Sequence, residues 1–176
     1  MAFSSTLPHY VAAQGKAVPF DYFTTLLAND NALQSDPTTM AWYAVGSFTP
    51  VIGGAGGTSG QTYASQVGAY IKIGRLVLVT FRAALTATGT ITGAVQIQGL
   101  PFASDNVTNL NSNTTVRFDS LTTNWIHVHA RLTPNTTAAA LEGATAAGVS
   151  NDTALAATDI GNTTILEGTL IYRTAT

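Results

Sequence analysis

The feature that most constrains the fold is a β-rich stretch between Gly68 and Phe102. Gly74-Arg75 separates two apolar runs, and glycine accepts the positive φ that a tight hairpin turn requires. After this turn every second residue is apolar, which predicts a strand with one buried face. The stretch therefore predicts a hairpin around which a β-sheet is built. The residues of the buried face are Val77, Val79, Phe81, Ala83 and Leu85.

The opposite face of the same strand is apolar only where the strand begins. Leu76 and Leu78 precede the polar residues Thr80 and Arg82 on this face. An apolar surface on a soluble protein is typical of an interaction site. We therefore expect this part of the face to be covered too, and we assign Leu76 and Leu78 to a contact between subunits.

Further strand patterns recur along the chain, with turn residues between them. The glycine-rich residues 53–60 predict a flexible loop, and Gly143 and Gly148 favour short strands or loops over a helix within residues 138–157. About eight strands, with turn signals every 8 to 12 residues, predict an all-β fold, either an antiparallel β-sandwich or a jelly roll. Besides the hairpin, strands are expected within residues 41–45, 48–52, 95–98, 115–119, 125–132 and 165–172.

The first 40 residues carry a different pattern. Leu7-Pro8 and Gly15 predict an extended arm up to about residue 18. Pro19 suits the first position of a helix, and apolar residues recur at helical spacing until Ser35-Asp36-Pro37. The sequence thus predicts an arm and one short helix in residues 1–40, followed by a β-sandwich domain in residues 41–176. The apolar stripe of the helix comprises Phe20, Phe23, Leu26 and Leu27.

The chain is poor in charge. Only 9% of its 176 residues are charged and the net charge is −2, whereas about a quarter is usual in soluble domains. Such a small number of charged residues protects only weakly against self-association. We therefore interpret the shortage of charged residues as a sign that part of the surface forms subunit contacts. The seven basic residues are scattered, which argues against nucleic-acid binding. The absence of cysteine excludes disulfides and thiolate metal sites.

The sequence shows neither a targeting signal nor a membrane segment. Its N-terminal residues lack a basic region followed by an apolar core, and no apolar run approaches about 18 residues. We expect no secretion through a signal peptide and no membrane insertion. A cytoplasmic product that assembles with copies of itself fits these features.

No combination of residues predicts catalysis. A Gly-x-Ser-x-Gly nucleophile elbow is missing, and the acidic residues are spread singly instead of in the pairs used by glycosidases. Residues 53–60 lack the Lys-Ser/Thr ending of a phosphate-binding loop. We therefore expect a protein without enzymatic activity and without a cofactor.

His127 and His129 are the sharpest candidates for a metal site. Two residues at i and i+2 of a strand point in the same direction, and a three-fold axis would bring six imidazoles together, enough for an octahedral transition metal. The same face is expected to carry Trp125 and Arg131, and the positive charge of Arg131 disfavours a cation. We expect His127, His129 and Trp125 to lie in a subunit contact without metal, with the metal site as the alternative.

Three motifs together resemble a β-rich domain of tailed-bacteriophage virion proteins, a group that includes tail-fibre tips and small capsid-decorating proteins. The motifs are Ser47-Phe48-Thr49-Pro50, the segment from Gly68 to Val77 after a glycine-rich gap, and Gly99-Leu100-Pro101-Phe102. The resemblance covers residues 42–102. It implies a non-enzymatic, homotrimeric protein on the virion surface, assembled in the host cytoplasm.

The resemblance leaves two roles open. In a capsid decoration or cement protein, the helix with Phe20, Phe23, Leu26 and Leu27 would attach the chain to the major capsid protein or serve trimerisation, unless it packs on its own β-domain. In a tail-fibre or baseplate receptor-binding protein, residues 103–114 and 143–158 would recognise a host surface glycan. A fibre needs a shaft, and the chain has neither heptads nor a shaft-like repeat, which favours the capsid role.

Overall fold

The computed structural model describes residues 42–148 and 151–175 of the chain. The arm and short helix predicted within residues 1–40 lie outside the described residues. The four residues assigned to virion attachment lie outside them as well. They are Phe20, Phe23, Leu26 and Leu27.

The predicted hairpin is present as β4 (Thr62–Ile73) and β5 (Leu76–Ala87), which pair antiparallel. Gly74 lies in the turn between them with a φ of 57°, a conformation that glycine adopts without strain. The alternation predicted for β5 is confirmed, because all five residues of the predicted core face are at most 4% exposed. They are Val77, Val79, Phe81, Ala83 and Leu85.

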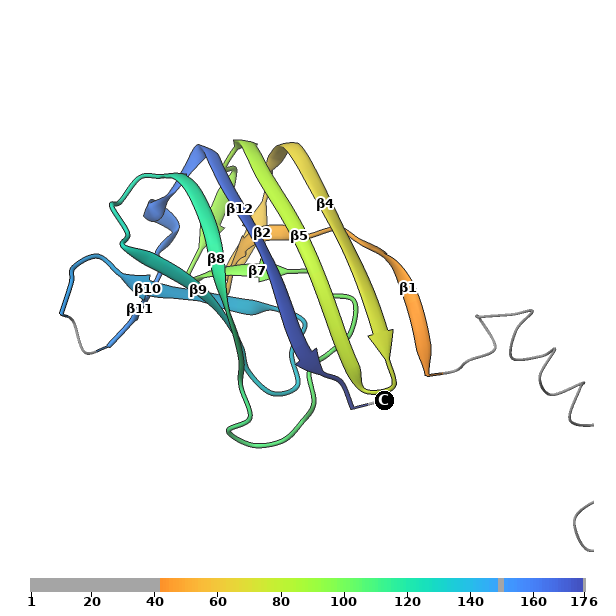
Figure 1. The fold of residues 1–176 in the computed structure, drawn as a ribbon. Helices are drawn as coiled ribbons and strands as arrows, with labels where there is room; N and C mark the ends of the chain where they lie inside the picture. The colour runs from red at the N-terminus through yellow and green to blue at the C-terminus, as the bar shows by residue number, and fades with distance from the viewer. Residues whose placement is uncertain (1–41, 149–150, 176) are drawn as a thin grey trace, which may run out of the picture. The chain divides into compact units, whose positions relative to one another are not determined.

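The strands form one curled antiparallel sheet with the order β1-β4-β5-β12-β8-β9-β10-β7-β2. Figure 1 shows that the first five strands make one layer and that the remaining strands run across it as a second layer. The all-β, antiparallel, sandwich-like class predicted from the sequence is confirmed. The first layer also contains β1 (Tyr43–Phe48), β12 (Ile160–Arg173) and β8 (Ser112–Leu121), and the second contains β9 (His127–Leu132), β10 (Ala139–Ala144), β7 (Val95–Gln98) and β2 (Val51–Gly54).

Strand β8 connects the two layers. Its residues 112–115 pair with β9, whereas residues from Val116 onward pair with β12. One strand therefore takes part in both layers, and the sheet folds over at this point. Apolar side chains of both layers fill the space between them, including Phe81 and Leu166 of the first layer and Ile97 and Leu141 of the second.

The structure corrects the expected number of strands. The described residues contain twelve strands, and the four beyond the expected eight are β10 and three very short ones. Residues 53–60 are not a plain loop, because Gly53 and Gly54 end β2 and a short strand follows. A side chain at Gly54 would clash with the backbone of Thr92, so glycine there permits close packing. The short strands are β3 (Gly57–Ser59), β6 (Thr90–Thr92) and β11 (Thr153–Ala154).

Within residues 42–148 and 151–175, the outer face of β5 is partly exposed where the strand begins. Leu76 is 48% exposed and Leu78 is half-buried. The described residues therefore do not cover this part of the face. Its coverage by another subunit stays a prediction. Within the same residues, no helix has the length and apolar character needed to span a membrane.

Candidate functional site

Strand β9 presents His127, His129 and Arg131 on one face. Val128, Ala130 and Leu132 alternate with them and are at most 1% exposed, because they point into the core between the layers. The alternation predicted for this segment is thus confirmed from His127 onward. The strand places two imidazoles and a guanidinium side by side on the surface of the second layer.

The two residues before β9 do not follow the predicted alternation. An alternation that began at Trp125 would place Ile126 in the core with Val128, but Ile126 is 57% exposed and Trp125 packs against the core. The reason is that β9 begins only at His127, so the period of two does not extend to these positions. The aromatic ring of Trp125 lies close to Gly143 of β10, where an added Cβ would come within 3.1 Å of it. Trp125 and the histidines therefore do not form the single surface row expected from the sequence.

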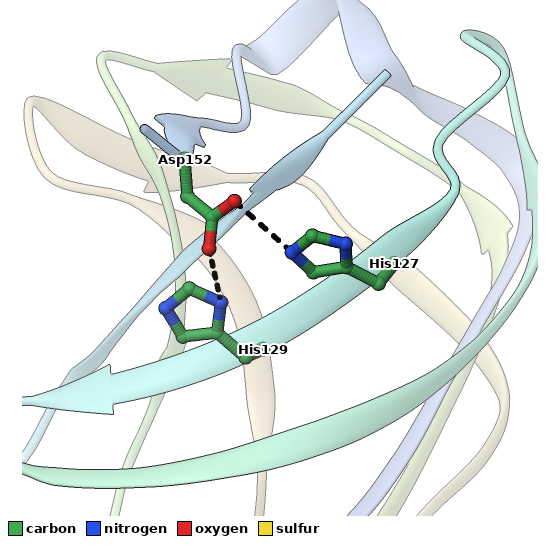
Figure 2. A group of neighbouring side chains, drawn as sticks. All are labelled: His127, His129 and Asp152. Carbon is green, nitrogen blue, oxygen red and sulfur yellow. Dashed lines mark hydrogen bonds and ion pairs between the residues drawn. The ribbon is translucent and has the colours of Figure 1, made fainter. Parts of the chain in front are cut away.

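Asp152 joins the histidines from a different part of the chain. Its carboxylate lies 3.0 Å from Nε2 of His127 through one oxygen and 3.2 Å from Nδ1 of His129 through the other (Figure 2). The two imidazole planes are nearly parallel, at 20°, with their centroids 6.3 Å apart. A single carboxylate thus holds both histidines.

The pairing of β9, β10 and β11 explains how Asp152 arrives there. Gly143 of β10 pairs with Thr153 of β11, and Ala144 pairs with His127. Extending the β10–β11 register by one residue places Asp152 across from Ala144, on the face that carries His127. Because Ala144 has only a methyl group, the longer side chains of His127 and Asp152 can meet above it.

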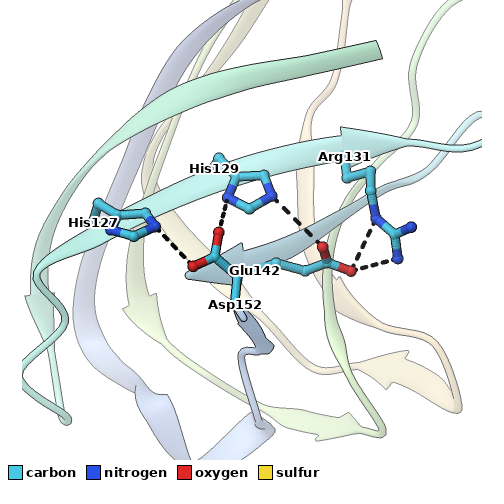
Figure 3. Close-up of polar contacts among 5 residues, drawn as sticks. All are labelled: His127, His129, Arg131, Glu142 and Asp152. Atoms are coloured by element: carbon cyan, nitrogen blue, oxygen red, sulfur yellow. Dashed lines mark hydrogen bonds and ion pairs between the residues drawn. The ribbon is translucent and has the colours of Figure 1, made fainter. Parts of the chain in front are cut away.

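Glu142 extends the group along the same face. It pairs with His129 in the β9–β10 register, and one of its carboxylate oxygens lies 3.6 Å from Nε2 of His129. The other accepts hydrogen bonds from Nε and Nη2 of Arg131, at 3.0 and 2.6 Å. Figure 3 shows the resulting row, in which basic and acidic side chains alternate from His127 to Arg131. The guanidinium charge is therefore balanced within the chain.

The three side chains of His127, His129 and Asp152 are able to hold a metal ion. Each offers one ligand atom, and these atoms all lie within 4.8 Å of one another. His127 and Asp152 are exposed, whereas His129 is half-buried, so the group is accessible from solvent. Sequence reasoning identified the histidines but missed Asp152 and Glu142. The only available signal was that both acids occur in a segment expected to form short strands or loops.

A second surface lies on the outer face of the first layer. We call Val45, Ile71, Ile73, Leu76 and Ile171 the outer apolar face, and each is between 42% and 58% exposed. They come from β1, β4, β5 and β12, and the register places them in adjacent rows. Of the predicted interface residues of β5, Leu76 belongs to this surface, and the half-buried Leu78 lies between Ile71 and Ile171 in the register. Both leucines are in a different layer from His127 and His129.

A row of paired charges borders the outer apolar face. Glu167 of β12 forms ion pairs with Arg82 of β5 and with Arg117 of β8. Arg117 also lies 3.7 Å from Asp119. The first three of these charged residues line a hollow of about 820 Å³ together with small residues such as Ala69 and Thr80. Two basic and two acidic side chains thus compensate one another at this border.

Comparisons of this chain with protein-family models, with curated proteins and with solved structures find no match.

Proposed function

We propose that the protein is a non-enzymatic structural protein of a tailed-bacteriophage virion, homotrimeric and displayed on the particle surface, with capsid decoration as its role. The observation that carries this proposal is the outer apolar face. Soluble monomers rarely leave a contiguous apolar surface of this kind in contact with water, and such surfaces are typical of interaction sites. The motif resemblance within residues 42–102 supports the assignment to a virion.

A second copy of the same chain is the partner that suits this face best. The charges at its border are already paired within the chain, so association would bury apolar surface without leaving a charge unpaired. Every copy presents the same surface, and three sheet faces can meet around a three-fold axis as the sides of a triangular prism. The low charge content of the chain also favours such association.

Light scattering on the purified chain tests the assembly. The expected particle has three times the 18.2 kDa chain mass. Substituting Ile71→Lys together with Ile171→Lys places two charges in the centre of the outer apolar face and should give a folded monomer. Both residues are exposed in the single chain, so its core is unaffected.

A matched control uses two apolar residues of similar exposure that lie elsewhere. Val107 and Leu110 are each 44% exposed in the loop before β8, and the variant Val107→Lys/Leu110→Lys should remain trimeric. A wild-type protein that is monomeric at micromolar concentration would contradict the trimer. Equal dissociation of both double variants would contradict the location of the interface.

Labelling of phage particles tests the virion role. Antibodies against the protein should decorate the capsid surface in electron micrographs. Labelling of the tail tip, combined with binding of the protein to a host surface glycan, would favour a receptor-binding protein instead. Particles that carry no label would refute the proposal.

A further inference from the structure

We propose that His127, His129 and Asp152 of a single chain bind one divalent transition-metal ion of the zinc type. The proposal does not depend on the virion role or on the trimer. It also differs from the six-imidazole arrangement considered from the sequence, because all the protein ligands come from one chain.

The spacing of the ligand atoms suits a small metal ion. In a tetrahedral zinc site with bonds of about 2.0–2.1 Å, neighbouring ligand atoms are roughly 3.3 Å apart. Asp152 lies at a similar distance from each imidazole, 3.0 Å from His127 through one carboxylate oxygen and 3.2 Å from His129 through the other. Since all three ligand atoms already lie within 4.8 Å of one another, small side-chain rotations are sufficient to close them around an ion.

The donor set selects the class of metal. Two imidazole nitrogens and one carboxylate oxygen are typical ligands of zinc, nickel, copper and iron. Calcium and magnesium prefer sites built entirely from oxygen. Three protein ligands leave a position for water, which fits the partial exposure of His127 and Asp152.

Glu142 provides the outer contact that a metal-binding histidine commonly has. If His129 binds the metal through Nδ1, its Nε2 carries the proton, and this atom lies 3.6 Å from a carboxylate oxygen of Glu142. A carboxylate in this position orients the ring and increases the basicity of the ligand nitrogen. At 3.6 Å the two groups are close without being hydrogen-bonded, so Glu142 supports the metal-bound tautomer of His129 through its negative charge.

The charge balance also favours a cation. The sequence suggested that Arg131 would repel a metal, but its guanidinium is bound to Glu142. With neutral imidazoles, the group of Arg131, Glu142 and Asp152 has one positive and two negative charges. The negative charge that remains resides on Asp152, which is the ligand itself.

Isothermal titration of the full-length, tag-free chain with zinc chloride tests the proposal. We expect one zinc ion per chain for the wild type and no binding for His127→Ala/His129→Ala. Asp152→Asn should weaken binding at least about tenfold, because it removes the charged ligand. Glu142→Gln removes the charge that orients the His129 ring and should weaken zinc binding about 10- to 100-fold. Calcium chloride should give no stoichiometric binding.

His9→Ala is the matched control, because it removes the third histidine of the chain and leaves the proposed ligands in place. It should bind zinc like the wild type, and circular dichroism should show that all variants are folded. In the wild type, zinc should shift the imidazole NMR signals of both His127 and His129. The proposal would be overturned if the wild type did not bind zinc or if its imidazole signals did not shift. It would also be overturned if Asp152→Asn bound zinc with wild-type affinity, if His9→Ala lost binding, or if calcium bound as tightly as zinc.

Discussion

Tyr172 should make the stability of the folded β-sheet domain depend on pH in the alkaline range. The residue lies in β12, is 2% exposed, and donates a hydrogen bond of 2.9 Å from its hydroxyl to the backbone carbonyl of Phe102. Burial removes the phenol from water and thereby raises the pKa of Tyr172 from 10.0 to about 12. In the unfolded chain the phenol ionises near pH 10, whereas in the folded chain it keeps its proton until about pH 12.

The sign of the effect follows from the number of protons bound in each state. Between pH 10 and 12 the folded state binds more protons than the unfolded state, so the free energy of unfolding falls as the pH rises. The stabilisation is complete below pH 10 and is lost as the pH approaches 12. Two pKa units correspond to a loss of up to about 2.7 kcal/mol.

The substitution Tyr172→Phe isolates this contribution. Near pH 8 it should cost about 1–3 kcal/mol, because the partly buried carbonyl of Phe102 loses its hydrogen-bond donor. The variant has no phenol at this position, so it should lack the alkaline loss of the wild type. The stability difference between the two proteins should therefore shrink steadily between pH 10 and 12.

Urea unfolding of both proteins, followed by circular dichroism at intervals from pH 8 to 12, measures this difference. Burial also raises the pKa of Tyr63, but this residue is present in both proteins and its effect cancels. Stability curves that remain parallel up to pH 12 would refute the reasoning, because they would mean that Tyr172 ionises equally in both states.

Two further predictions concern the strands next to the histidines and the first residues of the chain. Gly143→Ala should destabilise the protein by about 1–3 kcal/mol in thermal unfolding, because its Cβ would clash with the backbone carbonyl of His127. Gly161→Ala, a strand glycine whose added Cβ would have ordinary contacts, should cost much less, and equal losses would contradict this account. Deleting residues 1–34 should leave a β-rich trimer, as measured by circular dichroism and light scattering. This trimer should no longer bind virus particles that lack the protein. If the shortened chain still binds such particles, attachment through these residues is ruled out.

The sequence by itself determined the elements whose pattern is local. The alternation in β5 has a period of two because one side of the strand packs against the core, and Gly74 marks the turn because few other residues accept its φ of 57°. The same reasoning identified the all-β class and the common face of His127 and His129. In contrast, Trp125 and Ile126 were placed on the wrong sides, since periodicity alone does not show where a strand begins.

Only the tertiary structure decided which distant residues meet. Asp152 reaches the histidines because β11 pairs with β10 and β10 pairs with β9, and Glu142 balances Arg131 across the same pairing. Likewise, Leu76 and His127 lie in different layers because β8 pairs with β12 in one half and with β9 in the other. Strand order and register depend on the packing of the whole core. The alternation of side chains along a strand is the same whichever strand pairs with it, so the alternation does not identify the neighbouring strand. For this reason the sequence could identify two possible ligands, but only the fold brought the third ligand to them.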